Sequence, residues 1–293
     1  MVRQPTAVPG VLGGGERLPS PPLAETPASH LADLVAEREW YHTLELAPGV
    51  VTRGWFDTRA LPERIAFPDN LAGLRCLDVG TFDGYWAFEM ERRGASEVVA
   101  IDILDPAEWD WPAGSDPSMI AAIGARKGRG EGFEIARNAL GAKAQRIEQS
   151  VYDLDPDTNG RFDFVYLGSL LVHLRDPVGA LKRVRSVCAG RLVLVEAIDV
   201  PHSLLHPRRP SAALDAAGRP WWWKPNLAGL RRMVEAAGFD VQRGPAPFLV
   251  PRGEGQPKPP LELSALRDRH RRAAATIAWV GDPHAFVHAT PRG

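Results

Sequence analysis

Two acidic residues stand where apolar runs of the chain end, at spacings suited to binding a nucleoside. Residues 75–79 form an apolar run that contains Asp78, and Gly80 and Gly84 follow it. A second apolar run ends at Asp102. In open parallel sheets, ligands bind at the carboxyl ends of the strands, and an acid at the second strand end accepts hydrogen bonds from ribose hydroxyls. We therefore expect a nucleoside site with Asp102 at the ribose.

The spacing of the glycines disfavours a dinucleotide site. A pyrophosphate needs the pattern G-x-G-x-x-G, because the backbone must approach it closely at a helix N-terminus. Here Phe82 occupies the position of the middle glycine. Asp78 also brings a negative charge to the loop, which repels a pyrophosphate and suits a positively charged amino group. A nicotinamide-dependent dehydrogenase is therefore the poorer interpretation.

The loop from Asp78 to Gly84 resembles the first motif of the class I methyltransferases that depend on S-adenosylmethionine (SAM). Within this class, the chain is similar to the family of the tRNA wobble-uridine carboxymethyltransferase, over roughly residues 40 to 243. The branch-specific residues are His173, Arg175, Asp176 and Pro177. Ser169, Leu171 and a helix between Pro225-Asn226 and Gly238-Phe239 also match the family. The resemblance implies SAM as cofactor and S-adenosylhomocysteine as product.

Two departures from this family bear on whether SAM or carboxy-SAM donates the transferred group. Thr81-Phe82-Asp83 makes the loop bulkier than the family's usual residues. The residues that hold the extra carboxylate of carboxy-SAM in the family have no match in the N-terminal part of this chain. Ordinary SAM and methyl transfer are therefore expected rather than carboxymethyl transfer.

Strand ends and the resemblance together give the candidate site residues. Those expected at the cofactor are Asp78, Gly80, Thr81, Gly84, Asp102, Ile103, Ser150, Val151, Tyr152, Gly168 and Ser169. His173 is the first choice for a catalytic base, because imidazole exchanges protons near neutral pH; a packing role is the alternative. Glu196, Tyr41 and His42 are further catalytic candidates, and no metal site is expected.

Apolar runs that alternate with helical patterns predict an α/β fold with a doubly wound, mostly parallel, Rossmann-like sheet. The resemblance implies seven strands with an antiparallel last strand. We expect a disordered Pro/Gly-rich tail over 1–28 and an N-terminal cap segment over 29–70 that begins with a helix. The SAM-binding domain should then cover 71–293, with lid insertions at about 198–225 and 244–275.

Composition is that of an ordinary globular protein, with 44% hydrophobic residues, 24% charged residues and a formal net charge of −1. This charge gives no general attraction to nucleic acid. The two cysteines fall in apolar segments, which indicates core positions. No signal peptide or membrane span is expected, and the cytoplasm is the predicted location.

Tryptophans point to the acceptor. Trp221, Trp222 and Trp223 are consecutive, and Trp55, Trp109 and Trp111 are elsewhere in the chain. They predict an apolar or partly aromatic small-molecule acceptor under a lid, or else an insertion anchored to the core by its own indoles. Two basic runs, at 267–272 and at Arg126, Lys127 and Arg129, keep tRNA as an alternative acceptor. The bulky loop keeps a non-catalytic SAM-fold partner protein as another alternative. The residues specify neither the acceptor atom nor the oligomeric state.

Overall fold

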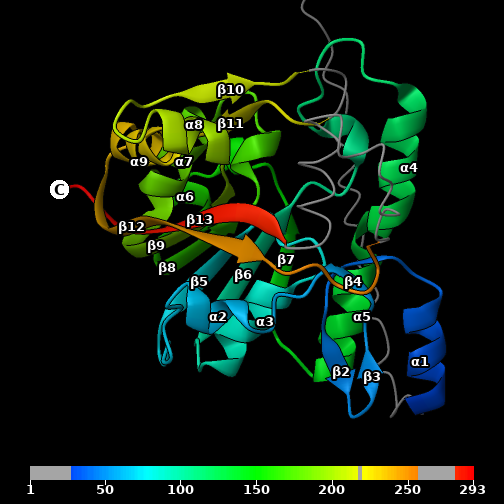
Figure 1. The fold of residues 1–293 in the computed structure, drawn as a ribbon. Coiled ribbons are helices and arrows are strands. Elements are labelled where there is room, and N and C mark those ends of the chain that lie inside the picture. Colours follow the sequence, from blue (N-terminus) through cyan, green and yellow to red (C-terminus); the bar gives the residue numbers. More distant parts are fainter. Residues whose placement is uncertain (1–27, 217–219, 257–280) are drawn as a thin grey trace, which may run out of the picture.

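The computed structural model describes residues 28–216, 220–256 and 281–293 (Figure 1). The tail expected over 1–28, except for its last residue, and the basic run at 267–272 therefore lie outside the described residues. Within the described part of the chain, no helix is long and apolar enough to cross a membrane.

A seven-stranded sheet forms the centre of the molecule (Figure 1). Its strand order is β12-β13-β9-β8-β5-β6-β7. β13 runs opposite to the other six strands of this sheet, so the predicted fold class is confirmed. The strands are β5 (Arg75–Val79), β6 (Glu97–Asp102), β7 (Gln145–Glu148), β8 (Phe162–Gly168), β9 (Cys188–Ala197), β12 (Phe239–Val250) and β13 (Asp282–Pro291).

Helices cover both faces of the sheet (Figure 1). On one face lie α3 (Tyr85–Arg92) and α5 (Glu131–Leu140), and on the other lie α7 (Pro177–Val187) and α9 (Leu227–Ala236). Polar side chains cap the N-termini of the last two of these helices. Asp176 Oδ1 accepts from Gly179 N at 2.8 Å, and Asn226 Oδ1 accepts from Gly229 N at 2.7 Å. These caps satisfy backbone donors that the first helical turn leaves without partners.

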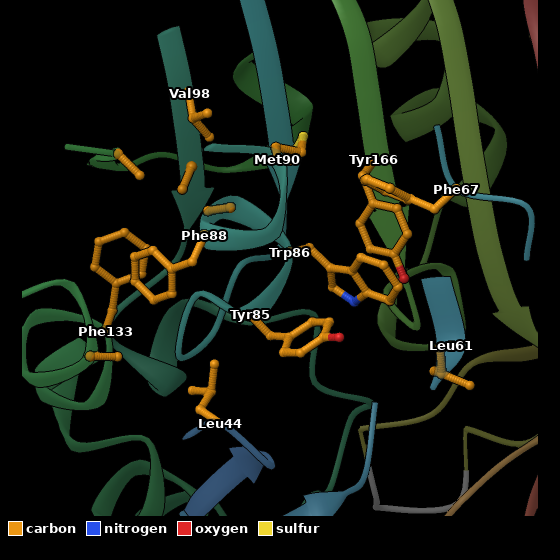
Figure 2. Close-up of a cluster of buried hydrophobic side chains, with 14 of the residues drawn as sticks. Leu44, Leu61, Phe67, Tyr85, Trp86, Phe88, Met90, Val98, Phe133 and Tyr166 are labelled. Atoms are coloured by element: carbon orange, nitrogen blue, oxygen red, sulfur yellow. The ribbon is translucent and has the colours of Figure 1, made fainter. Parts of the chain in front are cut away.

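Aromatic side chains fill the core between the sheet and α3. Figure 2 shows Trp86 against Tyr166, whose rings stack with centroids 4.1 Å apart. On the other side of the same helix, Phe88 packs against Phe133 at 5.1 Å. Because such rings bury a large apolar area, they fix α3 and hence the loop that precedes it. Cys76 and Cys188 are fully buried, as their positions in apolar segments predict.

The N-terminal segment is a helix followed by short strands. It contains α1 (Ala28–Ala36), β1 (Trp40–His42), β2 (Glu45–Ala47), β3 (Val50–Val51) and β4 (Gly54–Phe56). The segment begins with a helix, as predicted, and this helix ends at Ala36, before β1 pairs in parallel with β4. The indole of Trp40 is buried and donates to the Val35 carbonyl at 3.0 Å.

The remaining elements lie in connections around the sheet. They are α2 (Leu61–Arg64), α4 (Pro117–Lys127), α6 (Pro156–Asn159), α8 (Val200–Leu205), β10 (Ala212–Leu214) and β11 (Trp223–Pro225). The last three occupy the insertion expected over 198–225. At the second expected insertion, residues 244–250 belong to β12, the edge strand of the sheet. It tolerates Pro245 and Pro247 because no strand of the described residues pairs with its outer side.

Candidate active site

The glycine loop joins β5 to α3 and is held by backbone hydrogen bonds. Gly80 N and Thr81 N both donate to the Ile101 carbonyl of β6, at 2.9 and 3.1 Å. Gly84 has a φ of 91°, and a Cβ there would lie 2.5 Å from Phe88. This position therefore requires glycine. The loop is thereby fixed beside the end of β6, where Asp102 stands.

A cavity of about 400 Å³ opens at the carboxyl ends of β5, β6, β7 and β8. This size is within the usual range for small-ligand sites, roughly 300–1,000 Å³. Eight of the eleven residues expected at the cofactor line it: Gly80, Asp102, Ile103, Ser150, Val151, Tyr152, Gly168 and Ser169. His173 and Tyr41 also line it. The strand ends thus bring together most of the residues that the sequence singles out.

Asp78, Thr81 and Gly84 belong to the same loop but do not line the cavity. Asp78 is 1% exposed, and its Oδ2 has no hydrogen-bond partner among the described residues. Burial raises the pKa of this carboxyl to about 7. Asp78 is therefore buried and does not line the cavity, whereas the sequence predicts it beside an amino group of the ligand.

Asp83 of the loop fastens the N-terminal segment to the sheet. Its Oδ2 accepts from Tyr41 N at 2.8 Å and from His42 N at 2.9 Å, and its Oδ1 contacts His42 Nδ1. Asp83 and His42 are both buried. Of the two catalytic candidates in this segment, Tyr41 faces the cavity, whereas His42 is occupied with Asp83 and does not line it.

Glu196, at the end of β9, supports a loop rather than facing a ligand. It is fully buried and does not line the cavity. Its Oε2 accepts from Leu171 N at 2.6 Å, and its Oε1 accepts from Ala197 N at 2.8 Å. The 3-10 turn Leu171–His173 is thereby held, and with it the imidazole of His173.

The hydrogen bond of His173 determines its tautomer. Nδ1 lies 2.5 Å from the Pro220 carbonyl oxygen, which can only accept, so Nδ1 carries the proton. In the neutral ring Nε2 is then an acceptor. Burial lowers the pKa of His173, and the ammonium of Lys127 lowers it further. The residue is therefore a neutral base at physiological pH, on the wall of the cavity.

A histidine that sequence reasoning missed adjoins the same site. His284, in β13, donates from Nδ1 to the Asp282 carbonyl at 3.1 Å, and its Nε2 accepts from Ser169 Oγ at 3.0 Å. Its imidazole is buried, which lowers its pKa. The phenol of Tyr41 has a pKa raised well above its usual value by burial and by the charge of Asp282. Both side chains are neutral near pH 7.

Asp110 connects the loops around the cavity, and sequence reasoning also missed it. Its Oδ2 accepts from the Tyr152 hydroxyl at 2.7 Å and from Arg175 N at 2.8 Å. Its carbonyl accepts from Trp222 Nε1 at 2.6 Å. The acidic residues Glu108 and Asp110 beside tryptophans were the only signal available in the sequence, because their partners come from distant segments.

The three consecutive tryptophans have different roles in the structure. Trp221 lines the cavity and is 42% exposed. The Nε1 atoms of Trp222 and Trp223 donate to backbone carbonyls, those of Asp110 and Arg175, and so anchor the insertion. Both interpretations of the run thus describe part of it, since one indole faces the cavity and two hold the insertion in place.

The buried carboxyls predict how stability depends on pH. Burial raises the pKa of Glu196 to about 7, whereas an unfolded glutamate titrates at about 4.3. Between these values the folded state holds a proton that the unfolded state has lost, so stability falls as pH rises through this window. Urea denaturation between pH 5 and 8 should show a larger loss of stability for the wild type than for Glu196→Gln.

The exposed Glu254 provides the control for this measurement, because Glu254→Gln should keep the wild-type pH dependence. Comparing variant with wild type removes the opposing contribution of the buried histidines, whose lowered pKa values stabilise the fold as pH rises. Equal pH dependence in Glu196→Gln and wild type would contradict the assignment.

The lining residues fit SAM in their chemistry. The carboxylates that line the cavity are Glu39, Asp102, Glu108 and Asp110, and a negatively lined cavity suits a ligand with a sulfonium and an ammonium group. Asp102 can accept from ribose hydroxyls, since its two oxygens offer about four lone-pair sites and have one donor each. Val151 and Ile103 supply apolar surface for a base.

One curated relative is a tRNA U34 carboxymethyltransferase of Alcanivorax borkumensis, 27% identical over 174 residues. The match covers 58% of this chain and 46% of the relative, so the chain spans less than half of that protein's length.

Solved structures of similar fold include two methyltransferases. One is 1,6-didemethyltoxoflavin-N1-methyltransferase from Burkholderia thailandensis with S-adenosylhomocysteine, at 13% identity and TM-score 0.44, covering 80% of this chain and 76% of that chain. The other is magnesium protoporphyrin IX methyltransferase from Synechocystis with S-adenosylhomocysteine, at 15% identity and TM-score 0.47, covering 80% of this chain and 83% of that chain.

A family model described as a methyltransferase domain matches residues 55–243, well over half of the chain. The matched segment contains the glycine loop, Asp102, His173 and five strands of the central sheet in full. The chain therefore belongs to this methyltransferase family.

Proposed function

We propose that the protein transfers the methyl group of SAM to a small molecule that is apolar or aromatic in part. The observation that carries this proposal is the wall of the cavity, where Tyr41, Trp55, Trp109 and Trp221 meet from four segments of the chain. Aromatic faces of this kind bury flat, apolar ligands well. The cytoplasm is the location we propose with it.

The charges of the cavity support a small acceptor over RNA. Of the described residues that line it, Lys127 is the only lysine or arginine, and four are carboxylates. A phosphate backbone binds to lysine and arginine side chains and is repelled by carboxylates. The lining is therefore poorly suited to a nucleic-acid strand.

The proposed chemistry assigns proton removal to His173. SAM supplies an electrophilic methyl group when bound. Transfer is an in-line displacement, to which an enzyme contributes mainly the alignment of the reacting groups. An acceptor hydroxyl, amine or acidic carbon must also lose a proton, and Nε2 of His173 is the unprotonated nitrogen on the cavity wall.

One observation favours a second candidate, a tRNA-modifying enzyme of the wobble-uridine type. The tRNA U34 carboxymethyltransferase matches more than half of this chain. On this alternative the acceptor would be a single uridine turned into the cavity and stacked on its aromatic residues. Carboxy-SAM would then compete with SAM as donor.

Methyl transfer can be followed directly to separate the candidates. The purified protein is incubated with methyl-labelled SAM and either total tRNA or a protein-free extract of small molecules. We expect label in the small-molecule fraction and none in tRNA. Label in tRNA that ribonuclease releases would favour the second candidate. Tight SAM binding in calorimetry without transfer to either fraction would favour a non-catalytic partner protein.

A further inference from the structure

The side chain of Lys127 is buried against the residue expected to bind ribose. Lys127 is the last residue of α4, and its side chain is 3% exposed. Its Nζ lies 2.5 Å from Asp102 Oδ1. Burying an ammonium costs several kcal/mol unless it is paired and hydrogen-bonded, and the carboxylate of Asp102 provides that pairing.

Aromatic rings keep the ammonium at this place. Nζ lies 5.0 Å from the centroid of the Phe82 ring and 4.9 Å from that of Trp109. Both distances are within the range of cation–π attraction, about 6 Å. The rings attract the charge without using up its N–H groups as a carboxylate would. The Lys127 ammonium is thus held in place from the glycine loop, from β6 and from the segment after β6.

The ammonium has N–H groups left for a ligand. Lysine carries three donors, and Asp102 is the one hydrogen-bond acceptor that Nζ has among the described residues. Lys127 lines the cavity. Donors without a protein partner that face a ligand cavity can be satisfied by oxygen atoms of the ligand.

The carboxylate of Asp102 can accept further hydrogen bonds, which complements the free donors of Lys127. An ionised carboxylate only accepts, and each of its oxygens can accept more than once. Oδ2 accepts from Phe82 N at 2.8 Å, and Oδ1 accepts from Lys127. Both oxygens can therefore still accept a hydroxyl proton.

A vicinal diol matches this pair of side chains. Each of its hydroxyls donates one hydrogen bond and also accepts. A carboxylate alone can only take the two protons, whereas an ammonium beside it can donate to a hydroxyl oxygen. We propose that Lys127 and Asp102 form a donor–acceptor pair that recognises the ribose diol of the cofactor, and that Lys127 helps the enzyme to distinguish ribose from deoxyribose.

Calorimetry with cofactor analogues tests this proposal. S-adenosylhomocysteine and its 2′-deoxy and 3′-deoxy analogues are titrated into the wild type, Lys127→Met and Lys127→Arg. We expect Lys127→Met to weaken binding of the parent compound about 10-fold, the effect of losing a charge-assisted hydrogen bond. The loss should be at least several-fold smaller for one of the deoxy analogues. Lys127→Arg keeps a donor and should retain part of the preference for ribose.

An exposed arginine near Lys127 provides the control variant. Arg129→Met removes a positive charge two residues away, from a side chain that is 78% exposed, and should leave all three affinities unchanged. The ratio of two affinities in one sample does not depend on how much of a variant is folded. Unchanged or tighter binding to Lys127→Met would mean that lysine only occupies the diol site. Equal weakening for all three ligands would mean a purely structural role. Either result overturns the proposal.

Discussion

Replacement of His173 by glutamine is expected to lower kcat by about 100-fold or more, the usual contribution of a positioned general base. The affinity for S-adenosylhomocysteine should stay close to that of the wild type, because the substitution removes the basic Nε2 while an amide still fills the space. Glutamine can also donate to the Pro220 carbonyl, as Nδ1 does now. Steady-state kinetics and calorimetry give the two quantities, once the acceptor is identified.

The pH profile separates a base from a packing residue. Because burial lowers the pKa of His173, the wild-type kcat should fall only below about pH 6.5, where the imidazole becomes protonated. This acid limb should disappear in His173→Gln. His206→Gln, at an exposed histidine outside the cavity lining, should keep both the rate and the limb. An unchanged kcat in His173→Gln would assign the residue to the loop structure.

Replacement of Asp83 by alanine is expected to lower the free energy of unfolding by about 3 kcal/mol, because buried donors would lose their acceptor. The donors are Tyr41 N and His42 N, and the His42 ring loses its contact as well. Cofactor affinity should also fall, since Tyr41 is part of the cavity wall. Urea denaturation and calorimetry measure the two effects.

The matched control is Asp69→Ala. Asp69 also contacts a cation, Arg93, but its side chain is fully exposed. Screening by water makes exposed ion pairs weak, so this variant should unfold at the wild-type urea concentration. If Asp83→Ala behaves like Asp69→Ala, the N-terminal segment is held by its apolar contacts instead.

The sequence predicts the centre of the sheet well because these strands are covered on both faces. The run at 75–79 forms β5 with the predicted bounds, and the run that ends at Asp102 forms β6. Apolar runs that end at a glycine or an acid leave little ambiguity. The sequence predicts an insertion from about residue 244, whereas β12 continues to Val250. Pro245 and Pro247 indicate a loop unless the strand is known to lie at an edge of the sheet.

The site residues also fall into those that the sequence predicts and those that it does not. Strand ends such as Asp102, Ser150 and Gly168 could be located, because parallel topology brings them to one edge of the sheet. Asp110 and His284 could not, because their roles depend on contacts with segments far away in the chain. Glu196 shows the opposite error, since a strand-end acid can bind backbone amides of the next loop instead of a ligand.

Because Asp83 binds the backbone of β1, a fragment of the chain that folds on its own must include β1. The segment matched by the family model starts at residue 55 and stops at 243. A fragment trimmed to these limits would lack Tyr41 and His42 on one flank and β13 on the other. β13 lies between β9 and β12, so its removal would bare the backbone of β9 as an open edge prone to aggregation. The smallest fragment expected to fold therefore includes β1 before the matched segment and β13 after it.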